Sequence, residues 1–237
     1  MPELKEGIAA LVDFMEKDEK CNYKPDKTNW KANLEGSAAV LGGRLGKKPN
    51  ANTESELSSD NWPSQAHHLI PHLTLIAHAV AKWLKADQFI YEDTKYDVDH
   101  KKNGKWMPYA SSLPEWAIAT PQQKRDLMFK VMRLAKIQMH QGPHSSKNTY
   151  GIALYPYKER VRNYLDKVKD HSVSHYAGKP PCEDCKGKKQ HGKYPPRENT
   201  VAHVDKVSEL LEKDINKRII FVSRIAAEFA QIGGFDS

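Results

Sequence analysis

Long apolar runs are missing from this chain of 237 residues. No stretch approaches the ~18 consecutive apolar residues that a membrane-spanning helix needs, so we expect no membrane span. The first twenty residues mix acidic with apolar side chains and lack the uninterrupted apolar core of a secretory signal peptide. We therefore expect a protein that is cytoplasmic in the cell that makes it, unless another machinery exports it.

Cysteine is also scarce, with three residues in the whole chain. An odd and low count argues against a fold built on disulfides. Cys182 and Cys185 form a C-x-x-C pair, whereas Cys21 stands alone. Redox use of the pair is disfavoured because no strand-helix-strand pattern surrounds it.

Residues 171–199 contain almost no aliphatic side chains, so they cannot build a core of their own. His171 and His175 are four residues apart, which would place both rings on one face of a helix. With Cys182 and Cys185 they complete the four nitrogen and sulfur ligands of a tetrahedral structural zinc site. His191 is an alternative ligand, and a flexible loop with a chance C-x-x-C is the alternative interpretation.

Charge is unbalanced toward the positive side. Lysine and arginine number 37 against 30 aspartate and glutamate residues, for a formal net charge of +7. Such an excess favours a polyanionic partner such as nucleic acid, because each phosphate contact releases a condensed counterion.

Hydrophobic periodicity predicts an α+β protein that is mostly helical with a few short strands. Helices are expected at 3–16, within 30–45, and at 72–87, 121–139, 156–170 and 200–233. We expect four consecutive segments: an N-terminal helical and loop region (1–61), a central domain (62–170), a metal-bound insertion (171–199) and C-terminal helices (200–237).

Three short motifs carry candidate chemistry. The first is SQAHHLIP at 64–71, a short strand on which His67 and His68 would point to opposite faces. The second, NGKWMP at 103–108, combines a tight-turn signal with a returning strand. In the third, HQGPH, a tight turn would bring together His140 and His144, and neutral imidazole is a common ligand of divalent ions. Taken singly, each motif is better explained as an ordinary turn or a solvated loop.

Together and in this order, the motifs resemble the AHH nucleases of the HNH/endonuclease VII superfamily. The resemblance covers about residues 62–168 and includes Ala66-His67-His68, Asn103-Gly104 with Pro108, and His140-x-Gly142-x-His144. One departure is that five residues separate His144 from Tyr150. The family implies a ββα-metal (HNH-like) catalytic unit, here flanked by helices.

The resemblance also implies roles for individual residues. His68 would be the general base, and Asn103 would orient it or lie near the ion. The ion, Mg²⁺, Mn²⁺ or Zn²⁺, would be bound by His67, His144 and His140. Neighbouring lysines could contact phosphates, as Lys102, Lys105 and Lys147.

The implied activity is that of a largely nonspecific, metal-dependent DNA endonuclease. Family members are commonly toxins delivered into target cells by secretion machines and paired with an immunity protein. An RNase of the same fold, or a zinc-stabilised nucleic-acid-binding module without catalysis, are the alternatives.

Overall fold

The computed structural model describes residues 2–17, 21–23, 29–140, 157–178 and 182–236. His144 and Lys147 lie outside the described residues, so the roles expected for them stay predictions.

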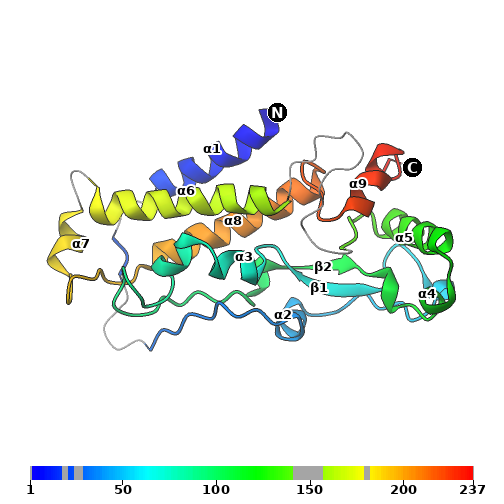
Figure 1. Ribbon diagram of the computed structural model, residues 1–237, viewed down its shortest axis with the longest axis horizontal. Helices are drawn as coiled ribbons and strands as arrows, with labels where there is room; N and C mark the ends of the chain where they lie inside the picture. The colour runs from blue at the N-terminus through cyan, green and yellow to red at the C-terminus, as the bar shows by residue number, and fades with distance from the viewer. Residues whose placement is uncertain (1, 18–20, 24–28, 141–156, 179–181, 237) are drawn as a thin grey trace. The chain divides into compact units, whose positions relative to one another are not determined.

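The described chain is mostly helical with one small sheet, which confirms the predicted class at this level (Figure 1). The α-helices are α1 (Pro2–Glu16), α2 (Ala38–Leu45), α3 (His72–Ile76), α4 (Glu115–Ile118), α5 (Pro121–Ala135), α6 (Tyr157–Ala177), α7 (Glu183–Gly187), α8 (Glu198–Asn216) and α9 (Arg224–Gln231). Four short 3₁₀ helices, η1 to η4, cover Glu54–Glu56, Ala79–Trp83, Lys101–Asn103 and Ala110–Ser112. The strands are β1 (Ser64–His68) and β2 (Gly104–Pro108).

The helix expected over residues 72–87 is wrong as a single element, because the chain forms α3 and then η2. His78 separates them with an extended backbone, φ −93° and ψ 143°, and its ring accepts a hydrogen bond from the backbone N–H of Val80. Helix α5 likewise ends earlier than expected, since Lys136 adopts the left-handed conformation with φ 52°.

The chain divides into two compact units, each assembled from three separate segments. Unit 1 comprises Met1–Gly36, Leu69–Asn103 and Val161–Glu212, and unit 2 comprises Ser37–His68, Gly104–Arg160 and Lys213–Ser237. Helices α6 and α8 contribute residues to both units. The units therefore differ from the four consecutive segments suggested by the sequence.

Unit 2 contains the sheet, in which β1 and β2 pair antiparallel with His67 opposite Lys105 and His68 opposite Gly104. Helix α2 packs on the face that carries Ala66 and its cross-strand partner Trp106. A Cβ added at Gly104 would overlap with the side chain of Leu41 from α2. Glycine at this position therefore lets the helix approach the strand. The Asn-Gly pair does not form the tight hairpin turn suggested by the sequence, because Asn103 ends η3 and Gly104 begins β2.

The core of unit 2 is an aromatic and aliphatic cluster that joins α5 to α9, with Phe129 and Phe229 at its centre. Gln138 fastens the chain before α9 by donating to the carbonyls of Ile215 and Ile220 and accepting from Val222 N–H. These bonds satisfy a buried amide, and burial would otherwise be costly for it.

Unit 1 has an aromatic core of its own. The ring of Trp83 stacks between those of Phe89 and Tyr176, with centroid separations of 4.7 and 4.9 Å. This stack supports the C-terminal end of α6. None of the helices in the described part of the chain is long and apolar enough to cross a membrane.

Candidate functional site

The two histidines of the SQAHHLIP motif lie at the end of β1, as the sequence predicts. Successive strand residues point to opposite faces, so His67 and His68 diverge. His67 is 5% exposed, whereas His68 is only partly buried. The strand therefore directs one imidazole into unit 2 and leaves the other within reach of solvent.

The buried face of β1 brings together residues that are far apart in sequence. The ring of His67 lies 4.5 Å from that of His140 and 6.1 Å from that of Tyr157, between centroids. Burial raises the pKa of the Tyr157 hydroxyl above its ordinary value, which keeps the phenol neutral. Two of the three histidines expected to bind the catalytic ion are therefore neighbours.

Asn103 is a fully bonded buried amide, 2% exposed, in unit 1. It accepts from the backbone N–H of Ile70 and from the hydroxyl of Ser208, and it donates to the carbonyls of Ile70 and Val98. Its own carbonyl accepts from Leu69 N–H, and Leu69 directly follows His68 in the chain. Asn103 therefore fixes the backbone next to the candidate base.

Two of the lysines expected to bind phosphate have partners within their own units. Lys102 pairs with Asp205 at 3.2 Å, and Lys105 donates to the side chain of Asn216 at 3.0 Å. Both side chains contact residues of α8. Arg160, which also flanks the motifs, is buried and pairs with Asp214 at 2.8 Å.

A second group of residues in unit 1 can hold a metal ion. The ligand atoms of Cys21, His175, Cys182 and Cys185 all lie within 4.8 Å of one another. The Cys21 sulfur is 3.0 Å from that of Cys182 and 3.9 Å from that of Cys185, and His175 Nε2 is 3.1 Å from the Cys185 sulfur. Thiolates that share a tetrahedral zinc with 2.3 Å bonds are separated by about 3.8 Å. The cluster therefore has nearly the dimensions of such a site.

Local structure explains how the ligands meet. His175 lies in the last turn of α6, and its carbonyl accepts from the N–H of Cys182. Cys182 is the N-cap of α7, and Cys185 lies within this helix three residues later. The hydroxyl of Tyr23 donates to the Cys185 sulfur at 3.0 Å, the type of outer contact that orients a metal ligand.

The pKa values of the thiols differ according to their surroundings. Burial raises the pKa of Cys185 to about 12 and raises that of Cys21 as well. Burial opposes the ionisation of Cys182 too, but the hydrogen bond with Cys21 and the backbone N–H groups of α7 outweigh it and lower its pKa. Thiolate is the metal-binding form, so a metal ion must displace protons here and its affinity must rise with pH.

Three of the four zinc ligands expected from the sequence belong to this cluster, and Cys21 is the fourth member instead of His171. The ring of His171 packs edge-on against that of His203, with centroids 4.8 Å apart. His191 is exposed in a turn with φ 48°. The sequence did contain a signal for Cys21, since a C-x-x-C pair needs further ligands and Cys21 is the one remaining cysteine.

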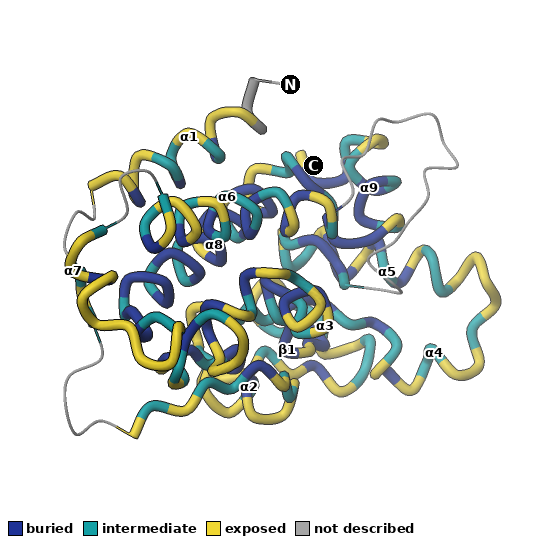
Figure 2. The backbone as a smooth tube through the Cα atoms, turned by 60° about the vertical axis from the view of Figure 1, so that its left-hand side comes forward, coloured by how far each residue is buried: buried dark blue, intermediate teal, exposed yellow. Residues whose placement is uncertain are grey.

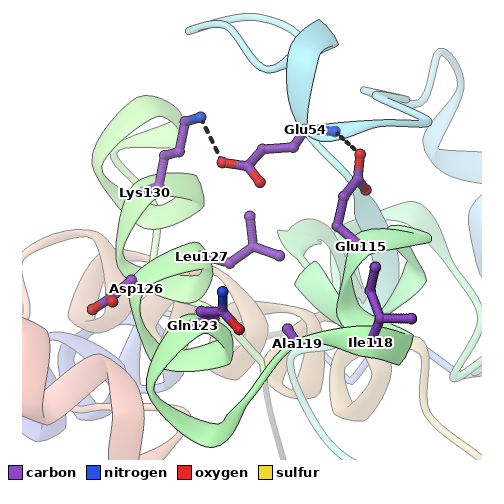
Figure 3. Close-up of a pocket in the computed structure, with 8 residues that line it drawn as sticks. All are labelled: Glu54, Glu115, Ile118, Ala119, Gln123, Asp126, Leu127 and Lys130. Atoms are coloured by element: carbon purple, nitrogen blue, oxygen red, sulfur yellow. Dashed lines mark hydrogen bonds and ion pairs between the residues drawn. The ribbon is translucent and has the colours of Figure 1, made fainter.

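A pocket of about 360 Å³ opens in unit 2 between η1, α4 and α5 (Figure 3). Lys130 pairs with Glu54 at 2.9 Å, and Glu115 accepts from the backbone N–H of Glu54. That backbone hydrogen bond lowers the pKa of Glu115. The pocket contains none of the histidines or cysteines discussed above.

Comparison with known proteins gives no relative from which to identify this site, since no family model, curated protein or solved structure matches the chain. The candidate sites therefore depend on their own geometry and chemistry.

Proposed function

We propose that this protein is a metal-dependent endonuclease that hydrolyses phosphodiester bonds of DNA with little sequence preference. The observation that carries the proposal is the 4.5 Å approach of His67 to His140, on the face of β1 opposite His68. One pair of imidazoles can then bind a cation while the neighbouring ring serves as a base.

The residues suit a hydrolytic step. His68 accepts a proton from water, and the water oxygen attacks phosphorus while the bond to the 3′ oxygen breaks. Imidazole is the side chain that most often serves as a general base in enzymes. His68 is the last residue of β1 and only partly buried, so water can approach its ring.

His67 and His140 would hold the divalent ion, Mg²⁺, Mn²⁺ or Zn²⁺, with His144 as the further ligand implied by the family resemblance. Such an ion supplies stabilisation of the negative charge that develops on the phosphate oxygens. Asn103 acts as a positioning residue, because its hydrogen bonds fix the backbone of Leu69, directly after the base, and of Ile70.

A plasmid assay tests the activity. Purified protein is stripped with EDTA, supplied with Mg²⁺, Mn²⁺ or neither, and incubated with supercoiled DNA and, in parallel, with structured RNA. The proposal expects nicked and linear DNA only in the presence of added ion. Cleavage of RNA alone would assign the same chemistry to an RNase, and intact substrates under all conditions would refute the nuclease.

For the cluster of Cys21, His175, Cys182 and Cys185, we propose a structural zinc ion. Three thiolates and one imidazole form a closed donor set typical of structural rather than catalytic zinc. The ion would join the chain after α1 to the end of α6 and to α7. A zinc-stabilised nucleic-acid-binding module without catalysis is the second candidate function, and it is favoured if DNA is bound but never cut.

The biological role proposed is that of an antibacterial toxin with a cognate immunity protein, and it derives from the family resemblance alone. Expression of the wild type in bacteria beside His68→Ala tests it. Loss of viability and fragmented chromosomes with the wild type alone are expected, and equal growth of both strains would contradict the role.

A further inference from the structure

A cluster of positive charge follows Cys185, the second cysteine of the C-x-x-C pair. The lysine loop, defined as residues 186–193, contains Lys186, Lys188, Lys189 and Lys193. The first three are exposed, and Figure 2 shows the backbone around α7 as largely exposed. The loop itself contains no acidic residue, and of its four lysines Lys186 pairs with Glu183 of α7 at 3.8 Å.

Both ends of the lysine loop are fixed. Its start directly follows Cys185, which belongs to the metal cluster together with Cys182, and the N–H of Lys186 donates to the carbonyl of Cys182. Its end forms a two-residue turn, in which Gln190 and Lys193 exchange backbone hydrogen bonds of 2.9 Å around His191 and Gly192. Beyond the turn, the backbone of Tyr194 bonds to Phe89 and Tyr91. The loop is thus held in one shape although it has almost no core of its own.

Aromatic rings fix two of the lysine side chains. The ammonium of Lys188 lies 4.0 Å from the centroid of the Tyr23 ring, and that of Lys189 lies 4.1 Å from the centroid of the Tyr194 ring. Tyr23 also donates to the sulfur of Cys185, so Lys188 rests on a residue that contacts the metal cluster. Cations held in place in this way lose less side-chain entropy when they bind an anion.

We propose that the lysine loop binds the phosphate backbone of DNA, and that the metal ion in the cysteine cluster keeps it in the binding shape. This rests on the proposed function, because it gives the nuclease a second DNA contact on unit 1. Lysine contacts to phosphate carry affinity but no sequence information, as a nonspecific enzyme requires.

A nucleic acid fits this surface better than a membrane does. Among the described residues, none of the exposed large hydrophobic side chains lies between residues 182 and 194, so an apolar anchor for a bilayer is lacking there. Several exposed lysines close together in the chain instead suit the phosphates of a nucleic acid backbone.

The test uses the full zinc-loaded chain carrying His68→Ala, so that DNA is bound without being cut. Fluorescence anisotropy with a labelled duplex measures affinity at several salt concentrations. The loop variant is Lys186→Gln/Lys188→Gln/Lys189→Gln. The matched control, Lys130→Gln/Lys136→Gln/Lys217→Gln, removes the same charge from three exposed lysines of unit 2.

The loop variant should bind about ten-fold or more weakly at low salt, and its salt slope should fall by ~0.9 for each lost phosphate contact, while the control stays near the parent. Cys21→Ser, which disrupts the cluster, should weaken binding similarly. A loop variant that binds like the control overturns the inference, as does a loss of binding to phosphatidylserine vesicles with unchanged DNA affinity.

The outcomes separate this inference from the nuclease proposal. If the wild type binds DNA through the lysine loop but never cuts it, the inference about the loop stands and the nuclease proposal is refuted. If the wild type cuts DNA but the loop variant binds DNA as tightly as the control, the nuclease proposal stands and the inference about the loop is refuted.

Discussion

The imidazole of His67 lies with its centroid 4.5 Å from that of His140, although the two residues belong to separate motifs of the sequence. The contact joins the buried face of β1 to the chain that follows α5. Tyr157, the first residue of α6, lies beside the same pair, 6.1 Å from His67 between ring centroids. A strand, the segment after α5 and the start of a helix thus meet at two imidazoles, which is the arrangement on which the nuclease proposal depends.

Cys21, rather than His171, should determine whether the protein retains zinc. Wild type should carry about one zinc ion per chain after mild chelation, because four nitrogen and sulfur ligands close the site. Cys21→Ser should lose it, whereas His171→Ala should retain it, since that ring packs on His203. Metal analysis of the three purified proteins decides this. Zinc that survives Cys21→Ser and disappears with His171→Ala would reverse the ligand assignment.

Gly104→Ala should destabilise unit 2, because the new methyl group overlaps with the side chain of Leu41. Overpacking of this kind costs about 1–3 kcal/mol in the free energy of unfolding. Gly43→Ala is the matched control: no atom lies within 4 Å of the added Cβ, and alanine favours the helix. Urea unfolding measures both.

Combining Gly104→Ala with Leu41→Ala supplies a further check on this explanation. Removing the Leu41 side chain should make the alanine at position 104 less costly than it is in the wild type, since the two residues are in contact. Strictly additive effects of the two changes would contradict the overlap as the cause.

His78 should make stability depend on pH. Burial lowers its pKa below 6.5, and the opposing attraction of Asp166, 3.3 Å away, does not cancel the effect. As pH falls, His78 therefore becomes protonated in the unfolded chain before it does so in the folded protein. The free energy of unfolding is highest above pH ~6.5 and decreases as the pH falls toward the pKa of His78 in the folded protein. His78→Asn, which can still accept from Val80 N–H, should show a smaller fall in Tm between pH 7.5 and 5.5. If Tm falls as much in His78→Asn as in the wild type, His78 is not the cause of the pH dependence.

Local patterns predicted much of the fold. The apolar spacing in 3–16 and in 121–139 predicted helices that the structure contains as α1 and α5. The break at His78 could not be read from periodicity, because it depends on a side chain bonding to the backbone two residues later. The pairing of β1 with β2 is long-range, and only the motif resemblance suggested it.

The same contrast applies to the candidate sites. The C-x-x-C pair and His175 were visible as ligands because their spacing is short. Cys21 was available as the one remaining cysteine, but no spacing linked it to the pair, since only the folded chain brings the segment after α1 to the end of α6. Asn103 was recognised by its motif, whereas its hydrogen bond from Ser208 on α8 depends on tertiary packing.

The most direct measurement is the rate of plasmid cleavage by His68→Ala beside wild type and His72→Ala, all purified identically and assayed with Mn²⁺. Removal of a general base should lower the rate by ~10²–10⁴-fold, while His72→Ala, changed in α3, should cut like the wild type. Manganese affinity should survive His68→Ala and be lost in His67→Ala. A His68→Ala protein that cleaves DNA at the wild-type rate would contradict the account.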